Sequence, residues 1–310
     1  MGVLNRLSHV LAHPRRFDNL RRIEALDPET DYDEILALTA REEFPWDYVQ
    51  GTSIAFMRDY GVPSISRLLH RTGEFERHGL KRYDDTILIG QESTIDGIDS
   101  GRGHAAVKRL NQIHGHYDIP NDEFAYVLAT TIVGPVRWIS MYGWRQPHPH
   151  ELVAITRVTT RFGELMGIKG LPTTYDGYLQ LLLDFERAHF SPDPANTALA
   201  EASISIARAI APAPVRPLVR RVTVALMDSP LREALGLPPQ PSWFVSLVRR
   251  TLRLRGRALR FAGPRTSPYL HKPVTYPNGH RLSDLGPFSM LDALNAATTV
   301  QSVNERELHA

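Results

Sequence analysis

The stretch NDEFAYVLATTIVGPVRWISMY, residues 121–142, decides the fold that the sequence predicts. Asn121 can cap a helix, and the two acids that follow it suit the positive end of the helix dipole. The run from Phe124 to Met141 is nearly as long as a minimal membrane helix, although Gly134-Pro135 should kink it. Because Arg137 lies within the run and charged residues flank it, we expect the central buried helix of a folded domain rather than a membrane span.

Helical spacing of apolar residues continues on both sides of this stretch. Short Pro/Gly segments such as 61–63 and 170–172 separate the periodic regions, and strand-like alternation is scarce. The sequence therefore predicts an all-α fold, a multi-helix bundle packed around one long central helix. The expected helices cover residues 63–71, 81–90, 101–117, 121–142, 148–166 and 174–188.

Three regions follow from the changes in composition along the chain. We expect a basic, turn-like lead-in over 1–31, a helical domain over 32–262 and a loop-rich tail over 263–310. The segment 245–265 contains seven arginines and no acid, interleaved with leucines, and residues 245–262 are predicted to be helical. This segment would either lie on an anionic membrane surface or form the solvated face of a docked helix, and both interpretations stay open.

Composition excludes several classes of protein. Of the 310 residues, 42% are hydrophobic and 23% charged, which is typical of a globular chain, and the net charge of +2 gives no reason to expect a nucleic-acid partner. The absence of cysteine rules out disulfides, cysteine nucleophiles and thiolate ligands to zinc or haem. Motifs typical of hydrolases, NTPases and Rossmann enzymes are missing. The basic N-terminus is too interrupted for a signal peptide, so a cytoplasmic location is expected.

His114 is the most informative candidate for chemistry. In the helix that Ser100 should cap, the residues four, seven and eight positions before His114 are Leu110, Val107 and Ala106, so its imidazole projects from the apolar face. His116 falls on the polar face instead. A lone inward-facing histidine is either a hydrogen-bonded core residue or an axial ligand that needs a dry pocket and a neutral ring.

Other candidate metal sites are weaker. Glu186-Arg187-Ala188-His189 is a Glu-x-x-His pair, but a carboxylate di-iron bundle needs two copies and the chain contains one. His114 and Asp118 stand four residues apart and could join another histidine around a single non-haem iron. His148-Pro149-His150 is more typical of a helix start than of a chelate.

A family resemblance is carried by a series of segments in order. KRYDDT at 81–86 precedes His114, and RWISMYGWR at 137–145, GELMGI at 163–168 and LPT at 171–173 follow it. This order resembles the catalytic domain shared by bacterial rubber oxygenase (latex clearing protein) and the fungal MpaB-type oxygenases of mycophenolic acid biosynthesis. The likeness extends over roughly residues 45 to 240 and consists mostly of helix order around one Arg, one Thr and one His.

The resemblance implies an all-helical fold with a globin-like core that holds haem b, an axial histidine, and oxygen chemistry on isoprenoid or other hydrophobic substrates. His114 falls at the position of the family's iron ligand, and Arg82 and Thr86 fall where rubber oxygenase has a distal Arg-x-x-Lys-Thr group. Here Asp85 replaces the lysine, and Asn111 and Asp118 replace the arginines that flank the ligand in rubber oxygenase. These departures argue against rubber itself as the substrate.

The residues agree with such a cofactor independently. Haem needs an apolar slot, one imidazole and cations for its propionates, and Lys108 and Arg109 share the helix of His114. Arg82 and Thr86 would hydrogen-bond dioxygen on the distal side, or else Arg82 pairs with Asp84 or Asp85 and Thr86 bonds back to its own helix.

The leading hypothesis is thus a haem-dependent oxidoreductase of the oxygenase type that uses dioxygen and a hydrophobic small molecule, with peripheral membrane contact through 245–265. Two alternatives stay open at this point. One is a non-haem iron enzyme built from His114, His189 and nearby carboxylates, and the other is a haem- or lipid-binding protein without turnover.

Overall fold

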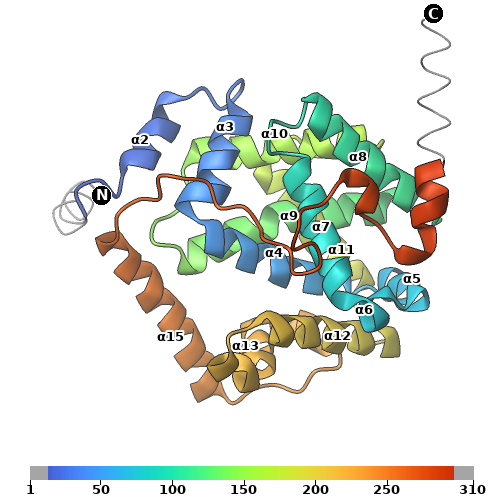
Figure 1. Cartoon of the computed structure of the whole chain (residues 1–310). Coiled ribbons are helices and arrows are strands. Elements are labelled where there is room, and N and C mark those ends of the chain that lie inside the picture. The colour runs from blue at the N-terminus through green and yellow to red at the C-terminus, as the bar shows by residue number, and fades with distance from the viewer. Residues whose placement is uncertain (1–12, 297–310) are drawn as a thin grey trace, which may run out of the picture.

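The computed structural model describes residues 13–296, and within that range it contains helices and no strand, which confirms the all-α prediction (Figure 1). The helices in chain order are Asp18–Ala25 (α2), Tyr32–Ala37 (α3), the π-helix Leu38–Glu43 (η1), Pro45–Asp59 (α4), Pro63–Thr72 (α5), Glu74–Arg77 (α6), Gly79–Glu92 (α7), Gly101–His114 (α8), Asn121–Tyr142 (α9), Pro149–Leu165 (α10), Tyr175–His189 (α11), Pro194–Ile210 (α12), the 3₁₀ turn Ala213–Leu218 (η2), Val219–Leu226 (α13), Ser229–Ala234 (α14), Ser242–Ala258 (α15), and the 3₁₀ turns Leu259–Phe261 (η3), Leu282–Asp284 (η4) and Phe288–Met290 (η5).

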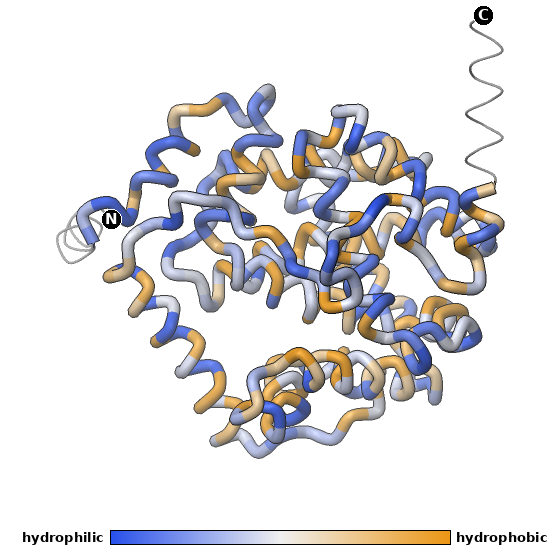
Figure 2. The backbone as a smooth tube through the Cα atoms, viewed as in Figure 1, coloured by the Kyte–Doolittle hydropathy of each residue, from blue (hydrophilic) through white to orange (hydrophobic). Residues whose placement is uncertain are grey.

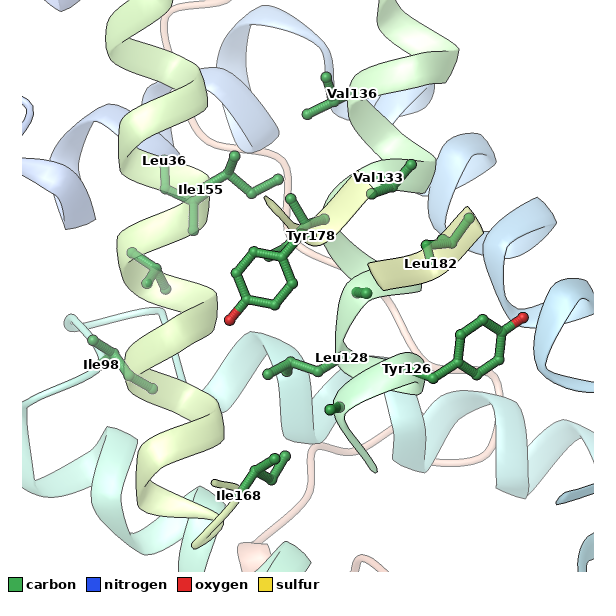
Figure 3. Packing of buried hydrophobic residues seen from close by; sticks show 14 of the residues in the cluster. Leu36, Ile98, Tyr126, Leu128, Val133, Val136, Ile155, Ile168, Tyr178 and Leu182 are labelled. Atoms are coloured by element: carbon green, nitrogen blue, oxygen red, sulfur yellow. The ribbon is translucent and has the colours of Figure 1, made fainter. Parts of the chain in front are cut away.

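The long helix α9 lies at the centre of the bundle, as the sequence predicts. Side chains of α9, α10 and α11 converge in the largest apolar cluster, where Leu128 and Val133 meet Ile155 and Tyr178 (Figure 3). Helix α9 also packs closely on α4. This approach needs a glycine at position 134, because a Cβ there would clash with the Cβ of Ala55. In the described part of the chain α9 alone is long and apolar enough to cross a membrane, but 61% of its apolar window is buried inside the fold. Burial of this kind is typical of a core helix.

Helix boundaries follow the predicted ones closely, with one informative exception. Helix α8 ends at His114, whereas the expected helix continued to residue 117. Gly115 has a low helix propensity, and Pro120 disfavours helical geometry in the residue before it, so the chain leaves the helix at this point. His114 is therefore the last residue of α8, directly before a tight turn in which the Tyr117 amide donates to the His114 carbonyl.

The described parts of the two end regions pack on the helical domain, while residues 1–12 of the predicted lead-in and 297–310 of the predicted tail lie outside the described residues. In α2, Ile23 is fully buried against Ile35, Leu38 and Ala154. At the other end, residues 266–290, which we call the C-terminal strap, run from the end of α15 back across the molecule to α7 and α8 (Figure 1).

A second group of helices, α12 to α14, lies below the main bundle in Figure 1. It has an apolar cluster of its own, in which Leu199, Leu231 and Leu235 are fully buried together with Met57 and Tyr60 from the end of α4. Helix α15 leaves this group by packing on α13 and then reaches α9, where Gly256 lies so close to the Tyr142 carbonyl that no larger residue would fit.

Candidate functional site

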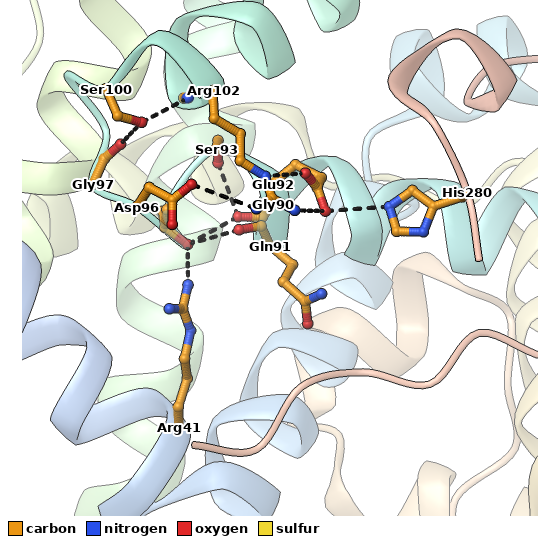
Figure 4. A network of polar contacts seen from close by, with 12 residues as sticks. Arg41, Gly90, Gln91, Glu92, Ser93, Asp96, Gly97, Ser100, Arg102 and His280 are labelled. Carbon is orange, nitrogen blue, oxygen red and sulfur yellow. Dashed lines mark hydrogen bonds and ion pairs between the residues drawn. The ribbon is translucent and has the colours of Figure 1, made fainter. Parts of the chain in front are cut away.

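Helices α7 and α8 carry the predicted site residues, and a polar network fixes the connection between them (Figure 4). The Ser100 hydroxyl caps α8 by accepting from the Gly103 amide. Arg102 donates to both oxygens of Glu92, at 2.5 and 2.9 Å, and His280 of the C-terminal strap lies 3.2 Å from the same carboxylate. The connection between the two helices is therefore held by partly buried ionic contacts to Glu92 as well as by the loop.

His114 faces inward, as its helical position predicts, whereas His116 is exposed. Its Nδ1 atom is buried and has no hydrogen-bond partner among the described residues. The ring lies against Phe124 of α9, with ring centroids 5.2 Å apart. Burial, followed by the charge of Arg82, lowers the pKa of His114 to about 4. The imidazole is therefore neutral at neutral pH, which is the form that ligates a metal.

Arg82 and Thr86 lie one turn apart on α7. The Arg82 guanidinium donates to the Thr86 hydroxyl, which in turn donates to the Arg82 carbonyl at 2.7 Å. The guanidinium also lies over the Phe75 ring, 5.5 Å from its centroid. The structure thus brings Arg82 and Thr86 together, and the charge of Arg82 acts on His114. The back-bonded threonine is confirmed.

Asp84 and Asp85 do not pair with Arg82, because they hold the C-terminal strap. Asp84 lies 2.8 Å from His271 and accepts from the Thr275 amide at 2.7 Å. Asp85 accepts from Lys81, the Tyr276 hydroxyl and the Gly286 amide, at 2.7, 2.6 and 3.1 Å. Asp85 therefore stabilises the position of the C-terminal strap.

Lys108 and Arg109, the expected propionate partners, have different surroundings. Arg109 is buried and donates to the carbonyls of Leu285 and Ser283 in the C-terminal strap, both at 2.9 Å. Lys108 lies on the exposed side of α8. The structure thus places Arg109 on the strap, and the role of both residues at a cofactor stays a prediction.

A cavity of about 290 Å³ adjoins this region. Tyr117, which follows His114 by three residues, lies in its wall, and the charges of Arg82 and Glu74 act on its hydroxyl. The cavity is lined by Leu68, Arg71, Thr72, Glu74, Tyr117, Pro287, Ser289 and Met290. Sequence reasoning missed these residues. Proximity to His114 in the chain could have indicated Tyr117, but no local signal indicates that Pro287 and Met290 lie beside it.

The residues of the alternative metal sites have other surroundings in the structure. Glu186 binds Arg58 through both carboxylate oxygens and accepts from the Tyr126 hydroxyl, while His189 is exposed and stacks on Phe185. His148 caps α10, which confirms the interpretation of His148-Pro149-His150 as a helix start. Residues 13–296 contain no group of three His, Asp or Glu side chains that could hold a metal ion. Haem ligation by a single histidine needs no such group.

Within residues 13–296 the protein is an all-α bundle in which the buried Nδ1 atom of His114 has no hydrogen-bond partner. The chain belongs to the family described as ER-bound oxygenase mpaB/B′/rubber oxygenase, catalytic domain, whose match covers residues 60–261. This range contains Arg82, Thr86 and His114, and it lies somewhat further toward the C-terminus than the expected 45 to 240. The C-terminal strap is outside it.

Relatives agree with this assignment. The ER-bound oxygenase mpaB′ of Penicillium brevicompactum is 30% identical over 275 residues, covering 80% of this chain and 65% of that protein. The ER-bound oxygenase mpaB of Penicillium roqueforti (strain FM164) is 29% identical over 215 residues, which are 64% of this chain and 72% of its own length. The mpaB of P. brevicompactum is 31% identical over 224 residues, 66% of this chain and 57% of that relative. The chain thus spans just under two thirds of the first relative.

Proposed function

We propose that this protein is a haem-dependent oxidoreductase of the oxygenase type, in which His114 is the axial ligand of haem b. The observation that carries the proposal is the buried Nδ1 atom of His114, which has no partner among the described residues. Leaving a buried polar atom unsatisfied costs about 1–3 kcal/mol, so such atoms concentrate where a ligand or water completes them. The apolar contact with Phe124 and the low pKa of about 4 suit a neutral nitrogen donor.

When bound, haem supplies the iron that activates dioxygen. The residues of the chain prepare the surroundings. His114 keeps its ring unprotonated, since burial and the charge of Arg82 both disfavour the imidazolium. The Arg82 guanidinium presents donors on α7 that would stabilise developing negative charge. The Thr86 hydroxyl accepts from Arg82 and gives its single proton to the Arg82 carbonyl, so it would have to release that carbonyl to act as a second donor. Lys108 and Arg109 are the cations proposed for the propionates, and Arg109 would exchange its strap carbonyls for one of them.

The proposed substrate is a hydrophobic small molecule of isoprenoid or lipid-like character. The cavity beside Tyr117 has an apolar part formed by Leu68, Pro287 and Met290, which would contact such a molecule, and a polar part formed by Arg71, Thr72, Glu74 and Ser289. The protein is proposed to be cytoplasmic with peripheral membrane contact through 245–265, and the description of its relatives as ER-bound supports contact with a membrane.

An absorption spectrum of the purified protein tests the cofactor. We expect a strong Soret band that disappears in His114→Ala, while far-ultraviolet circular dichroism stays helical. His116→Ala is the matched control, because it removes an exposed histidine two positions away and should keep the band. A His114→Ala protein with an unchanged spectrum would refute the ligand assignment, and His104, His150 and His189 would be tested next.

The two alternatives give different results in the same experiments. Iron without a Soret band would favour the non-haem enzyme. A Soret band without oxygen consumption on long-chain isoprenoids or lipids would favour a binding protein without turnover.

A further inference from the structure

Helix α15 has two faces of different character. Its inner face is held firmly: Phe244 and Val248 are buried against α13, Arg255 donates to Asp47 at 2.8 Å, and Gly256 touches the end of α9. Just beyond the helix, Arg260 donates to the Trp144 carbonyl at 3.0 Å. Two of the seven arginines of 245–265 are therefore used inside the fold.

The outer face of α15 forms a continuous stripe. Side chains at spacings of four and three residues share one side of a helix, and such spacing links Trp243, Leu247, Arg250, Leu254, Arg257 and Phe261. The four apolar members are 64%, 52%, 60% and 66% exposed in chain order, among the most exposed large hydrophobic side chains of residues 13–296. We call these six residues together with Arg253 the α15 stripe. Figure 2 shows the alternation of hydrophobic and hydrophilic residues along this helix, which lies at the edge of the molecule.

The stripe has no acidic counterpart within the fold. Arg250, Arg253 and Arg257 are exposed, and none of them forms an ion pair in the part of the chain that the structure describes. Some exposed arginines elsewhere have carboxylate partners, as Arg157 has Glu29 and Arg187 has Asp184, and the stripe differs in joining its three cations to four exposed apolar side chains. Uncompensated cations beside exposed apolar side chains indicate an external partner that is both anionic and apolar.

We propose that the α15 stripe docks on the surface of an anionic lipid bilayer, with Trp243, Leu247, Leu254 and Phe261 in the headgroup and acyl boundary and the three arginines at lipid phosphates. The helix would lie in the plane of the membrane, as amphipathic helices rich in Arg, Trp, Phe and Leu do. A second copy of the chain fits the stripe less well, because pairing two stripes brings arginines together without an acid. This inference specifies the membrane contact in the proposed function but does not depend on haem, so the Soret test and the membrane test fail independently.

Vesicle flotation of the full-length protein tests the inference. We expect binding to phosphatidylcholine vesicles that contain phosphatidylserine, weak binding to phosphatidylcholine alone, and strong weakening as ionic strength rises from about 0.01 M to about 1 M, where the Debye length falls from about 30 to about 3 Å. Arg250→Gln with Arg253→Gln and Arg257→Gln should lower the partition coefficient about 100-fold, since each basic residue near a charged surface contributes about a fivefold factor. Changing Arg157, Arg161 and Arg187 to Gln removes the same charge elsewhere and should have an effect of only a few fold.

The apolar half of the stripe is tested separately. Serine at positions 243, 247, 254 and 261 should reduce binding by at least about tenfold, whereas Leu183→Ser with Val274→Ser, two exposed residues outside the stripe, should not. Brominated lipids should quench the fluorescence of Trp243, and this quenching should be absent in Trp243→Phe. All four side chains are exposed, so their replacement should not disturb the fold. An unchanged helical circular dichroism spectrum checks that reduced binding is not due to misfolding.

Three outcomes would overturn the proposal. The first is that the protein does not float with anionic vesicles at low salt. The second is that the stripe variants and their controls lose vesicle binding equally. The third is that light scattering shows a dimer, which the four serine substitutions convert to a monomer, while vesicles are not bound. The last result would identify the stripe as an interface between two copies.

Discussion

The sequence offers two segments with a histidine that could bind iron, Glu186-Arg187-Ala188-His189 and the end of α8 at His114, and their surroundings differ in the fold. At the end of α11, Glu186 is buried and fully partnered by Arg58 and Tyr126, and Arg58 also donates to Asp228 at 2.8 Å. At the end of α8, His114 has a buried nitrogen without a partner and lies beside Arg82 and Thr86. The Glu186 carboxylate is therefore fully partnered within the fold, whereas the His114 Nδ1 atom has no partner among the described residues.

The difference separates a structural cluster from a candidate binding site. A carboxylate that holds a buried guanidinium cannot also bind iron without leaving a charge unpaired, which is costly. An unpartnered neutral imidazole can accept a metal without breaking any contact. We call Glu186, Arg58, Tyr126 and Asp228 the α11 cluster; its contacts join α4, α9, α11 and the residue before α14, and so stabilise the fold. The predictions below are ordered by the expected change in the free energy of unfolding.

The largest change is expected for Glu186→Ala. This substitution leaves Arg58 buried without its bidentate partner, and we expect a loss of about 3–5 kcal/mol of stability, with little direct effect on haem binding. Urea unfolding followed by circular dichroism measures it. Asp184→Ala on the same helix is the control, because its pair with Arg187 is exposed and should contribute less than about 1 kcal/mol. A loss below about 1 kcal/mol in Glu186→Ala would show that the α11 cluster is not structural.

The second change concerns pH. The pKa of His114 is about 4 in the folded chain against 6.5 for an ordinary histidine. Above the ordinary value the ring is neutral in both states and pH has no effect through it. As pH falls from 6.5 toward 4 the unfolded chain binds a proton that the folded chain does not, so stability decreases. Between about pH 7.5 and about pH 5.0 the haem-free protein should lose about 2 kcal/mol through this group.

Comparison with a variant isolates this contribution from other titrating groups. His114→Asn cannot titrate and should be less sensitive to acid by about the same 2 kcal/mol, whereas His116→Ala should behave like the original protein. Identical pH profiles for the original protein and His114→Asn would mean that His114 is not protected from protonation, and the contrast between the two places would disappear.

A smaller change in stability is expected for Arg82→Ala. Arg82 contacts Thr86 and the Phe75 ring and has no buried ion pair, so its removal should cost about 1 kcal/mol or less. Turnover should fall by about 10²–10³, the effect of removing a donor that stabilises developing negative charge. Oxygen consumption by the haem-loaded protein measures it, with Arg82→Lys as the variant that keeps the charge. Expression of Arg82→Ala only as unfolded aggregate would instead assign Arg82 a structural role.

The smallest change is expected for His189→Ala. This histidine is exposed and only stacks on Phe185, so stability should stay within about 0.5 kcal/mol of the original and the iron content should not change. Metal analysis and thermal unfolding measure both quantities. Loss of iron in this variant would revive the non-haem site that the Glu186-Arg187-Ala188-His189 segment first indicated.

Local patterns predicted much of the fold. Helix α9 has the predicted bounds, because an acidic first turn, an apolar run and a glycine end define it locally. The predicted cap is wrong: Pro120 is the N-cap residue, no side-chain cap bond is present, and the Asn121 side chain binds the Lys169 backbone instead. The inward direction of His114 was likewise predictable, since the side-chain period of a helix depends only on positions four, seven and eight residues away. The early end of α8 was missed, although Gly115 and Pro120 carried the signal for it.

The surroundings of the site depend on contacts that no local pattern contains. From the sequence, Asp85 is a departure from a motif or a partner of Arg82, yet in the fold it accepts from Tyr276 and Gly286, which lie 191 and 201 residues away in the chain. The strap that appeared as a loop-rich tail thereby supplies Pro287 and Met290 to the wall of the cavity.

The sequence by itself determined the helices, the face of α8 on which His114 lies and the absence of cysteine chemistry, because backbone geometry and composition are properties of neighbouring residues. Only the tertiary structure decided which polar groups are satisfied and which are not. Glu186 accepts hydrogen bonds from Arg58 of α4, and Asp85 accepts hydrogen bonds from the C-terminal strap, while the Nδ1 atom of His114 has no partner among the described residues. Hydrogen-bond satisfaction depends on groups that meet in space from distant parts of the chain, and no periodicity along the chain encodes it.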